Sequence, residues 1–181
     1  MGLNNINNYK VYYRNIKYPR VEFKTGDLVL ILPLDQEPED ILERNKEWIL
    51  KKSLFIKECL SEIKDKKLID RSEEEFRELI YSLVDKNTHE LLINLNKINF
   101  RKMKTKWASI SPSKNLTVNK VVSYLPEHLI EYIIYHELTH LIEKRHNEKF
   151  WKIISNKFEN FKYLEKELFS YWFLVSRYFD C

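Results

Sequence analysis

The sequence predicts a protein of the α+β class, with short strands early in the chain and helices later. Two patterns support this class. β-Branched and aromatic residues are concentrated in short runs within the first third of the chain. Apolar residues at helical spacing follow in the middle and dominate the last third. Strands followed by helices in this order fit one α+β domain.

The first part of the chain is expected to form strands and a long helix. The predicted strands cover residues 10–16, 21–25 and 27–33. Gly26 and Asp27 offer a turn between the last two strands. Pro38 then begins a long helical stretch, with Ile49 and Ile56 among its apolar positions.

The rest of the chain contains further strands and a helical C-terminal part. Ser72 begins a helix with a capping box, because Glu75 stands three residues on, and the helix is expected to fade near Leu91. The predicted strands cover residues 97–103, 106–111 and 116–119, with a turn at 112–115. Further helices are expected from Pro126, from about Asn147 and over residues 161–179.

Composition indicates a globular protein outside the membrane. Hydrophobic residues make up 44% of the 181 residues, and the formal net charge of +4 leaves acidic or phosphate-bearing partners open. The two cysteines, Cys59 and Cys181, have no disulfide or zinc-ribbon spacing, which favours a reducing compartment. The longest apolar run, residues 28–34, is too short to cross a bilayer, and no signal peptide precedes it. We therefore expect a cytoplasmic protein without a membrane partner.

One motif is typical of a catalytic metal site. His136, Glu137 and His140 form the pattern His-Glu-x-x-His inside the helix that is expected to begin at Pro126. Residues four apart leave the same face of a helix, so both imidazoles can bind one metal ion, while the glutamate stands beside the ion as a general base for water. Ordinary polar residues on a solvated helix face are the alternative, but this helix is too apolar for unpaired His and Glu.

A third protein ligand is needed, and His146 is the expected one. Glu159 and Glu165 on later helices are the alternatives. A regular helix would turn His146 away from the ion, because six residues past His140 it has rotated by 600°. The helix is therefore expected to end or bend between Glu143 and His146.

These residues resemble the YgjP-like family of zinc-dependent hydrolases, relatives of the SprT-like and WLM metallopeptidases. The resemblance lies in RKMKTKWAS (101–109), LTVN (116–119) and LPEHLIEYIIYHELTHLIEKRHNEKFW (125–151), and WILKK (48–52) extends it towards the N-terminus. The chain departs from the family at Ile110, where members more often have cysteine. No proposed ligand is lost by this difference.

The resemblance implies a zincin-like fold, in which a small, mainly antiparallel sheet packs against the active-site helix. It implies metal ligation by His136, His140 and His146 and a catalytic base at Glu137. The expected cofactor is one Zn²⁺ ion, although another divalent metal is possible. We expect a single domain over residues 1–181, with the N-terminal strands and long helix in 1–70 and the catalytic core in 71–181.

Three functions remain open from the sequence. The first is a zincin-type metallopeptidase that cleaves peptides or proteins, which a strand at a sheet edge would hold in extended form. LTVN and KWASIS are the candidate edge strands. The second is a metal-dependent nucleotide (UTP-like) pyrophosphatase or phosphohydrolase. The third is a nucleic-acid-associated protein in which zinc only braces the fold, but a carboxylate beside an open metal position argues against it.

Several residues near the motif are candidates for substrate binding. Lys102, Lys104 and Lys106 would share one face of a strand and could hold phosphates, with Trp107 as a stacking surface; a solvated strand face and a core tryptophan are the plainer interpretations. Asn119, at the end of a strand, could orient the substrate or act as a turn or helix cap.

Overall fold

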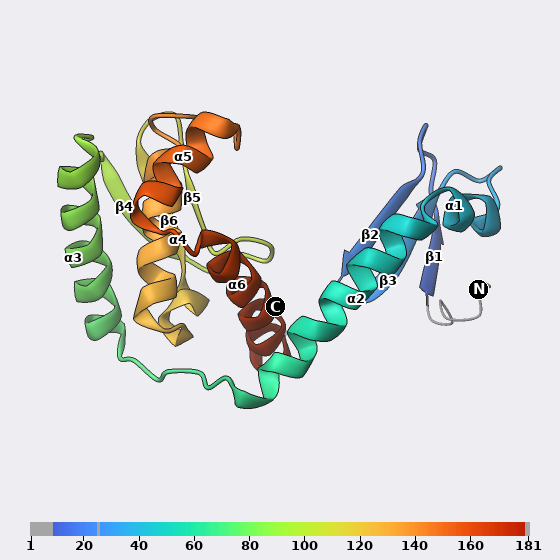
Figure 1. Ribbon diagram of the computed structural model, residues 1–181, viewed down its shortest axis with the longest axis horizontal. Helices are drawn as coiled ribbons and strands as arrows, with labels where there is room; N and C mark the ends of the chain where they lie inside the picture. Colours follow the sequence, from blue (N-terminus) through green and yellow to red (C-terminus); the bar gives the residue numbers. More distant parts are fainter. Residues whose placement is uncertain (1–8, 25, 180–181) are drawn as a thin grey trace. The chain divides into compact units, whose positions relative to one another are not determined.

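The structure is a computed structural model that describes residues 9–24 and 26–179 (Figure 1). The chain forms two compact units, Met1–Lys64 and Asp65–Cys181. This division falls close to the boundary expected between the N-terminal portion and the catalytic core, and the expectation of a single domain stays a prediction. Within the described residues, no helix is both long and apolar enough to cross a membrane.

The first unit is a three-stranded sheet with two helices. The sheet contains β1 (Tyr9–Tyr13), β3 (Asp27–Leu32) and β2 (Arg20–Lys24), in that spatial order. Gly26 has a φ of 94°, which supplies the turn that joins β2 to β3. The helices are α1 (Pro38–Arg44) and α2 (Lys46–Glu62), and the short helix η1 (Ile63–Asp65) follows. The expected long helix is thus broken at Asn45, whose side chain donates to the Ile41 carbonyl at 2.8 Å.

β3 is apolar throughout residues 28–32, and one of its two faces forms the core of this unit. The side chains that form it are Leu28, Leu30, Leu32, Ile41, Leu42 and Ile49. These residues lie on one face of the central strand and on the inward faces of the two helices, as periods of two and 3.6 residues require.

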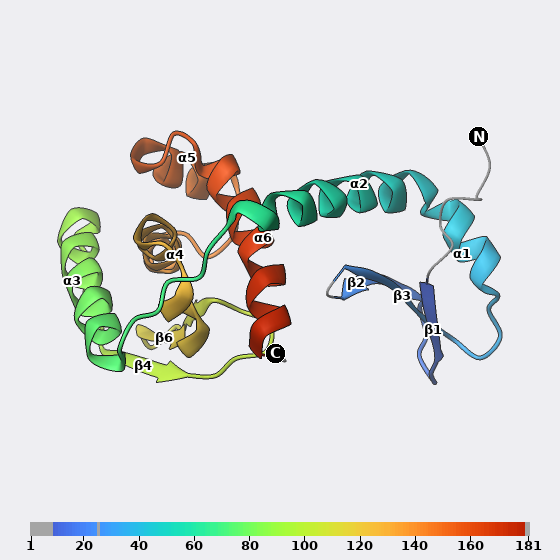
Figure 2. The same cartoon turned by 90° about the horizontal axis from the view of Figure 1, so that it is seen from below.

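The second unit contains the sequence motifs. Its elements are α3 (Glu73–Leu91), β4 (Lys97–Arg101), β5 (Ala108–Ile110), β6 (Asn115–Asn119), η2 (Lys120–Tyr124), α4 (Glu127–Thr139), α5 (Glu148–Lys157) and α6 (Phe161–Phe179). The expected capping box is present at the start of α3, where Ser72 and Glu75 each accept the other's backbone N–H. The helix α4 lies between α3 and α6 (Figures 1 and 2). It also packs against β5, and eight of its thirteen residues are buried.

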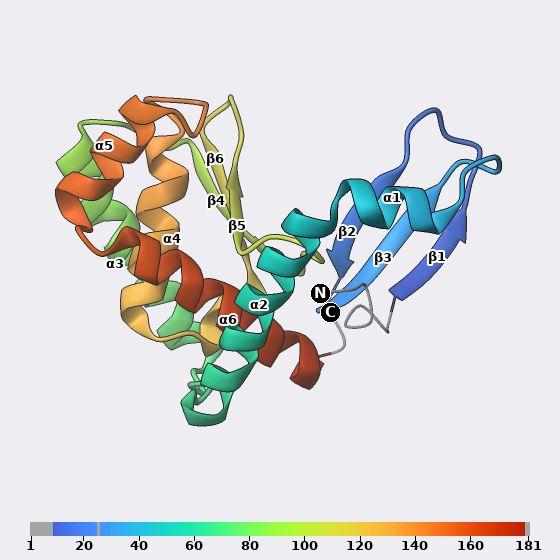
Figure 3. The same cartoon turned by 45° about the vertical axis from the view of Figure 1, so that its right-hand side comes forward.

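The α+β class is confirmed, but the pairing of the strands is not mainly antiparallel. In the second unit β6 is the central strand, parallel to β4 and antiparallel to β5 (Figure 3). The first unit has the same mixture, with β3 parallel to β1 and antiparallel to β2. Each sheet is therefore mixed, which sequence patterns could not reveal because parallel partners are joined by distant connections.

Candidate active site

Three histidines converge at the end of α4. His136 lies on the helix, His140 is its C-terminal cap, and His146 comes from the following loop. One nitrogen of each ring lies within 4.8 Å of the other two, and the Nε2 atoms of His136 and His146 are 3.0 Å apart. In the described part of the chain, these three residues form the group of potential ligands close enough to hold a metal ion.

The turn after α4 brings His146 back to the helix. The helix ends at Thr139, and the backbone N–H groups of Ile142 and Glu143 both donate to the Thr139 carbonyl at 2.9 Å. The expected bend between Glu143 and His146 therefore begins earlier, at His140. Positive φ values within the described residues occur at Gly26, Leu92 and Lys114, outside this turn. A glycine is not needed there, because the turn uses conformations open to every residue.

The Nδ1 atom of each of the two histidines at the end of α4 faces a hydrogen-bond acceptor. His140 places Nδ1 3.2 Å from the Glu143 carbonyl. His136 places Nδ1 3.7 Å from Glu165 Oε1, and the Tyr132 hydroxyl donates to the same oxygen at 2.5 Å. A proton held at Nδ1 leaves Nε2 as the metal-binding nitrogen. Glu165 thus lies behind His136, whereas the three ligand candidates face one another.

Burial keeps the helix imidazoles neutral. Desolvation, together with the neighbouring His140 and His146 rings, lowers the pKa of His136 to about 3. Burial also lowers the pKa of His140. A neutral imidazole offers a lone pair to a metal ion without first losing a proton, so the two rings are prepared for ligation at neutral pH.

Two aromatic residues of α5 fix the three rings. Phe150 is fully buried, and its ring centroid lies 5.0, 4.7 and 4.6 Å from those of His136, His140 and His146. The indole of Trp151 stacks on His146, with centroids 5.5 Å apart, and its Nε1 donates to the His146 carbonyl. The Phe-Trp pair after His146 therefore forms the wall against which the cluster is ordered.

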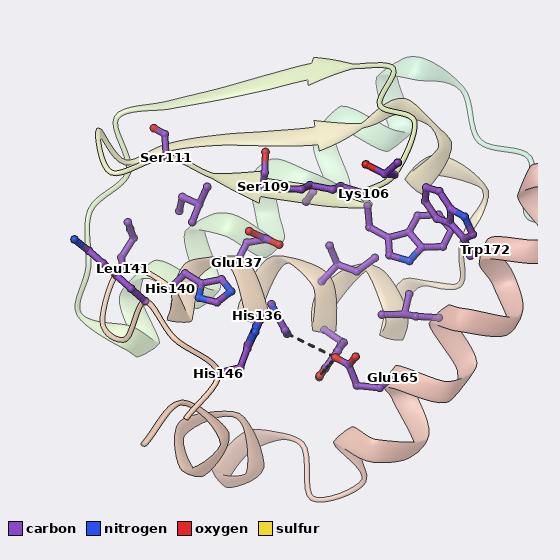
Figure 4. A pocket seen from close by; sticks show the side chains of 18 of the residues that line it. Lys106, Ser109, Ser111, His136, Glu137, His140, Leu141, His146, Glu165 and Trp172 are labelled. Atoms are coloured by element: carbon purple, nitrogen blue, oxygen red, sulfur yellow. Dashed lines mark hydrogen bonds and ion pairs between the residues drawn. The ribbon is translucent and has the colours of Figure 1, made fainter. Parts of the chain in front are cut away.

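Glu137 projects from α4 into a cavity of about 840 Å³ beside the three rings (Figure 4). Burial raises the pKa of its carboxyl to about 7, although a hydrogen bond from the Ile110 backbone and the charge of Lys106 oppose the rise. A carboxyl with a pKa near neutrality can accept and return a proton in one catalytic cycle. We name this cavity, which the histidines and Glu137 line, the active-site pocket.

The donor set fits a divalent metal ion. Three imidazole nitrogen donors suit zinc and its neighbours among the transition metals, and one side of the cluster is open to the active-site pocket. Glu137 and Glu165 both line the active-site pocket, and Glu165 contacts His136 on its Nδ1 side. A metal position that is open to a pocket is typical of catalytic sites, whereas structural zinc sites are closed.

Comparison with known proteins identifies the family. The model of the YgjP-like, metallopeptidase domain family matches residues 57–171, which is more than half of the chain. The chain belongs to the YgjP-like metallopeptidase family. It is accordingly a metal-dependent hydrolase with a zincin-like fold, and its substrate class is peptide or protein.

Two solved structures resemble parts of this family member. One is the metallopeptidase zymogen of Pyrococcus abyssi abylysin, with 25% identity and a TM-score of 0.46 over 49% of this chain and 90% of that one. The other is the metallopeptidase zymogen of Methanocaldococcus jannaschii jannalysin, with 34% identity and a TM-score of 0.45 over 55% and 90%. No curated protein sequence matches the chain.

The basic run of this YgjP-like protein is divided between two cavities. β4 ends at Arg101 and β5 starts at Ala108, so residues 102–107 form a loop rather than the expected strands. The prediction that alternation places three lysines on one strand face is therefore wrong. Lys106 and Trp107 line the active-site pocket, whereas Lys102 and Lys104 line a second cavity.

Asn119 is fully buried and has its hydrogen bonds within the protein. Its side-chain oxygen accepts from the N–H groups of Met103 and Val121, and its nitrogen donates to the carbonyls of Met103 and Lys106. The structure thus gives Asn119 the cap and turn role that the sequence left open. A substrate-orienting role remains untested and draws no support from this geometry.

Sequence reasoning missed two features of the site. Tyr132 lies one helical turn before His136, and this spacing could have indicated a shared face. The position of Glu165 behind His136 had no sequence signal, because it depends on how α6 packs against α4.

Proposed function

We propose that the chain is a zinc-dependent peptidase in which His136, His140 and His146 hold the ion and Glu137 is the general base. The convergence of three imidazoles beside a carboxylate that projects into the same pocket carries this proposal. Three histidines and an open position are typical of catalytic zinc sites. Zinc is preferred over other divalent metals because it accepts this nitrogen-rich set without a fixed geometry.

The chain's own residues perform the proton transfers. Zinc in such a site polarises the scissile carbonyl and makes water more acidic. Glu137 accepts a proton from the attacking water and later delivers it to the nitrogen of the leaving amine, so the carboxylate is restored. Its pKa of about 7 suits both transfers. The backbone N–H of Ile110 holds the carboxylate on the side of the helix that faces β5.

The edge strands of the second sheet are β4 and β5, because β6 is paired on both sides, and β5 is the edge strand that packs against α4. Of the two candidate edges, KWASIS therefore fits and LTVN does not. The Trp107 carbonyl accepts from Asn119 at 2.8 Å, and the Ser111 N–H donates to Asn115 at 3.0 Å. In an antiparallel pair, residues bonded to the partner strand alternate with residues whose backbone groups point away from it. The backbone N–H and carbonyl groups of every second residue from Trp107 to Ser111 thus point towards β6.

The intervening residues, Ala108 and Ile110, point their backbone groups away from β6 and towards α4. The Ile110 N–H donates to Glu137. The Ala108 N–H and carbonyl and the Ile110 carbonyl would pair with an extended peptide laid along β5. Such a peptide would pass directly beside the general base, which is the placement that hydrolysis of its backbone needs.

The active-site pocket also offers a place for an apolar side chain of the peptide. Leu168, Phe169 and Trp172 line it from one face of α6, since they are three, four and seven residues after Glu165. Trp107 packs edge-on against Trp172, with ring centroids 4.7 Å apart. We expect a large apolar side chain close to the scissile bond to be preferred.

The substitution Glu137→Gln tests the proposal. The variant should bind zinc like the wild type but hydrolyse peptides about 10²–10⁴-fold more slowly, because a general base is lost while the ligands remain. Zinc content is measured by inductively coupled plasma mass spectrometry, and cleavage is measured on a random peptide mixture. Glu148→Gln, on the exposed start of α5, is the matched control and should keep both properties.

Peptide cleavage by Glu137→Gln at the wild-type rate would refute the catalytic role. The nucleotide pyrophosphatase and the nucleic-acid-associated zinc protein gain no support from the family match. A panel of nucleoside triphosphates alongside the peptides tests the former directly.

A further inference from the structure

A second cavity lies where α3 begins and where β4 and β6 end. It has a volume of about 530 Å³, and we call it the basic pocket. Its lining contains five cationic side chains and one carboxylate: Arg71, Arg77, Lys102, Lys104, Lys120 and Glu73. A cavity with this excess of one charge concentrates ligands of the opposite charge.

The single carboxylate of the basic pocket is already neutralised. Glu73 Oε1 accepts from Arg77 at 3.1 Å through Nε and at 2.7 Å through Nη2. Lys102, Lys104 and Lys120 have no carboxylate within 4.0 Å among the described residues. Lys102 and Lys104 therefore present their charge to a ligand without an ion-pair partner, while the charge of Lys120 also acts on Glu73.

Arg71 adds a further positive charge. Its guanidinium donates to the backbone carbonyls of Ser123 and Leu125, both at 2.6 Å, which fixes the side chain without cancelling its charge. The N-cap of α3, Ser72, and its first residue, Glu73, also line the pocket.

One buried amide fixes the backbone of the three lysines. Lys102 and Lys104 flank Met103, whose N–H and carbonyl both bond to Asn119. Lys120 follows Asn119 directly, and the same side chain caps the helix η2 that starts there. The charges thus converge on a preorganised backbone, which lowers the entropy cost of binding an anion.

The loop of residues 102–107 connects the two pockets. Lys102 and Lys104 line the basic pocket, and Lys106 and Trp107 line the active-site pocket. The loop crosses the end of β6 to join β4 with β5, a distance of two strand spacings or about 10 Å. An extended peptide covers that distance with about three residues.

We propose that the basic pocket is an exosite for an acidic segment of the peptide substrate. The inference rests on the proposed peptidase function, because peptide and protein are the substrate class of the family. Charge complementarity selects Asp and Glu, and the connecting loop places them about three or more residues from the scissile bond. The enzyme would then recognise an apolar residue at the active site and acidic residues further along the chain.

The experiment uses the zinc-loaded protein and peptides that share one cleavable core. One set carries a tail of four Glu residues at either end of the core, and the other carries four Gln residues. Binding is measured by fluorescence anisotropy on Glu137→Gln, and cleavage is measured on the wild type. We expect one Glu-tailed peptide to bind about tenfold more tightly than its Gln counterpart, with a difference that shrinks as salt rises.

The triple change Lys102→Gln, Lys104→Gln and Lys120→Gln should abolish the preference while the Gln-tailed peptide is still cleaved. The matched control changes the exposed lysines Lys149, Lys152 and Lys162, which line neither pocket, to Gln. An equal loss in the control, or equal binding of the Glu-tailed and Gln-tailed peptides by Glu137→Gln, would overturn the exosite.

Failure of the exosite and failure of the proposed function are distinguishable. Cleavage of all peptides without a preference for Glu removes the exosite and leaves the peptidase. Preferred binding of the Glu tail without cleavage keeps the exosite and removes the peptidase. Displacement of the Glu tail by ATP at a concentration tenfold below that of the peptide would assign the basic pocket to nucleotides instead.

Discussion

The position of one proton on each imidazole decides whether the three histidines can bind a metal ion. The Glu143 carbonyl faces Nδ1 of His140 and fixes the proton there. This contact does not depend on the identity of a side chain, because the carbonyl belongs to the backbone. His136 faces the carboxylate of Glu165, which Tyr132 holds through its hydroxyl. A carboxylate behind a ligating histidine fixes the tautomer and raises the basicity of the nitrogen at the metal.

The substitution Glu165→Gln should therefore weaken zinc binding without abolishing it. The amide keeps the size of the side chain but loses the charge that holds the His136 proton. We expect zinc affinity to fall by a factor of about ten, measured by competition with a chromophoric chelator. Glu159→Gln, on the exposed turn before α6, is the control and should leave zinc affinity unchanged. Equal affinities of Glu165→Gln and the wild type would remove Glu165 from the metal centre.

Among the elements, the loop between β4 and β5 depends most on one residue. Asn119 is buried, and it makes hydrogen bonds to Met103, Lys106 and Val121. Neither Gly nor Pro occurs in residues 102–107, so no local turn residue determines the path of the loop. The conformation of the loop is instead imposed by a side chain that comes later in the sequence.

We expect Asn119→Ala to lower the free energy of unfolding by about 2–4 kcal/mol, because backbone groups of the loop and of η2 lose their partners. The value is measured by chemical denaturation. Asn115→Ala tests a residue on the same strand whose side chain makes no hydrogen bond in the described structure, and it should cost about 0.5 kcal/mol or less. Similar losses for both variants would show that strand packing, rather than the amide, stabilises the loop.

Elements with local signals could be predicted, and those with distant partners could not. The capping box at Ser72 and the N-cap at Asn147 depend only on residues that are close in the sequence, and both are present. The ends of β4 and β5 were misplaced because the loop between them is determined by Asn119. The metal motif was visible through its spacing, but Phe150 and Glu165 reach it only through the packing of α5 and α6.

The whole molecule consists of a small sheet-and-helix unit and a larger unit with both pockets. In the larger unit, a largely buried ion pair joins the segment before α3 to the last helix. Lys66 Nζ lies 2.8 Å from Glu167 Oε1, and His128 Nε2 lies 3.0 Å from Oε2. These contacts connect three segments that are far apart in the sequence.

The same cluster predicts how stability depends on pH. Burial raises the pKa of Glu167, but the hydrogen bonds and charges of Lys66 and His128 outweigh this effect and leave it below the ordinary value of 4.5. The unfolded state then binds a proton more readily, so the stabilisation is complete above the unfolded pKa and is lost as pH falls through the folded one. The stability difference between wild type and Glu167→Gln should be largest above about pH 5 and should shrink in acid.

Denaturant unfolding between pH 3 and pH 7 measures this difference. Glu78→Gln, which replaces an exposed glutamate of α3, provides the reference curve. A difference that stays constant over the whole range would show that Glu167 contributes through packing rather than charge.

The central claim is that three histidines, rather than two histidines and a carboxylate, hold the metal ion. Zinc affinity of His146→Ala, compared with that of Glu165→Gln and Glu159→Ala, tests it most directly. Since each ligand contributes a large share of the binding free energy, we expect His146→Ala to bind zinc about a hundredfold more weakly or worse. The expected loss is about tenfold for Glu165→Gln and negligible for Glu159→Ala. Wild-type zinc affinity in His146→Ala, with a far larger loss in either glutamate variant, would contradict the claim.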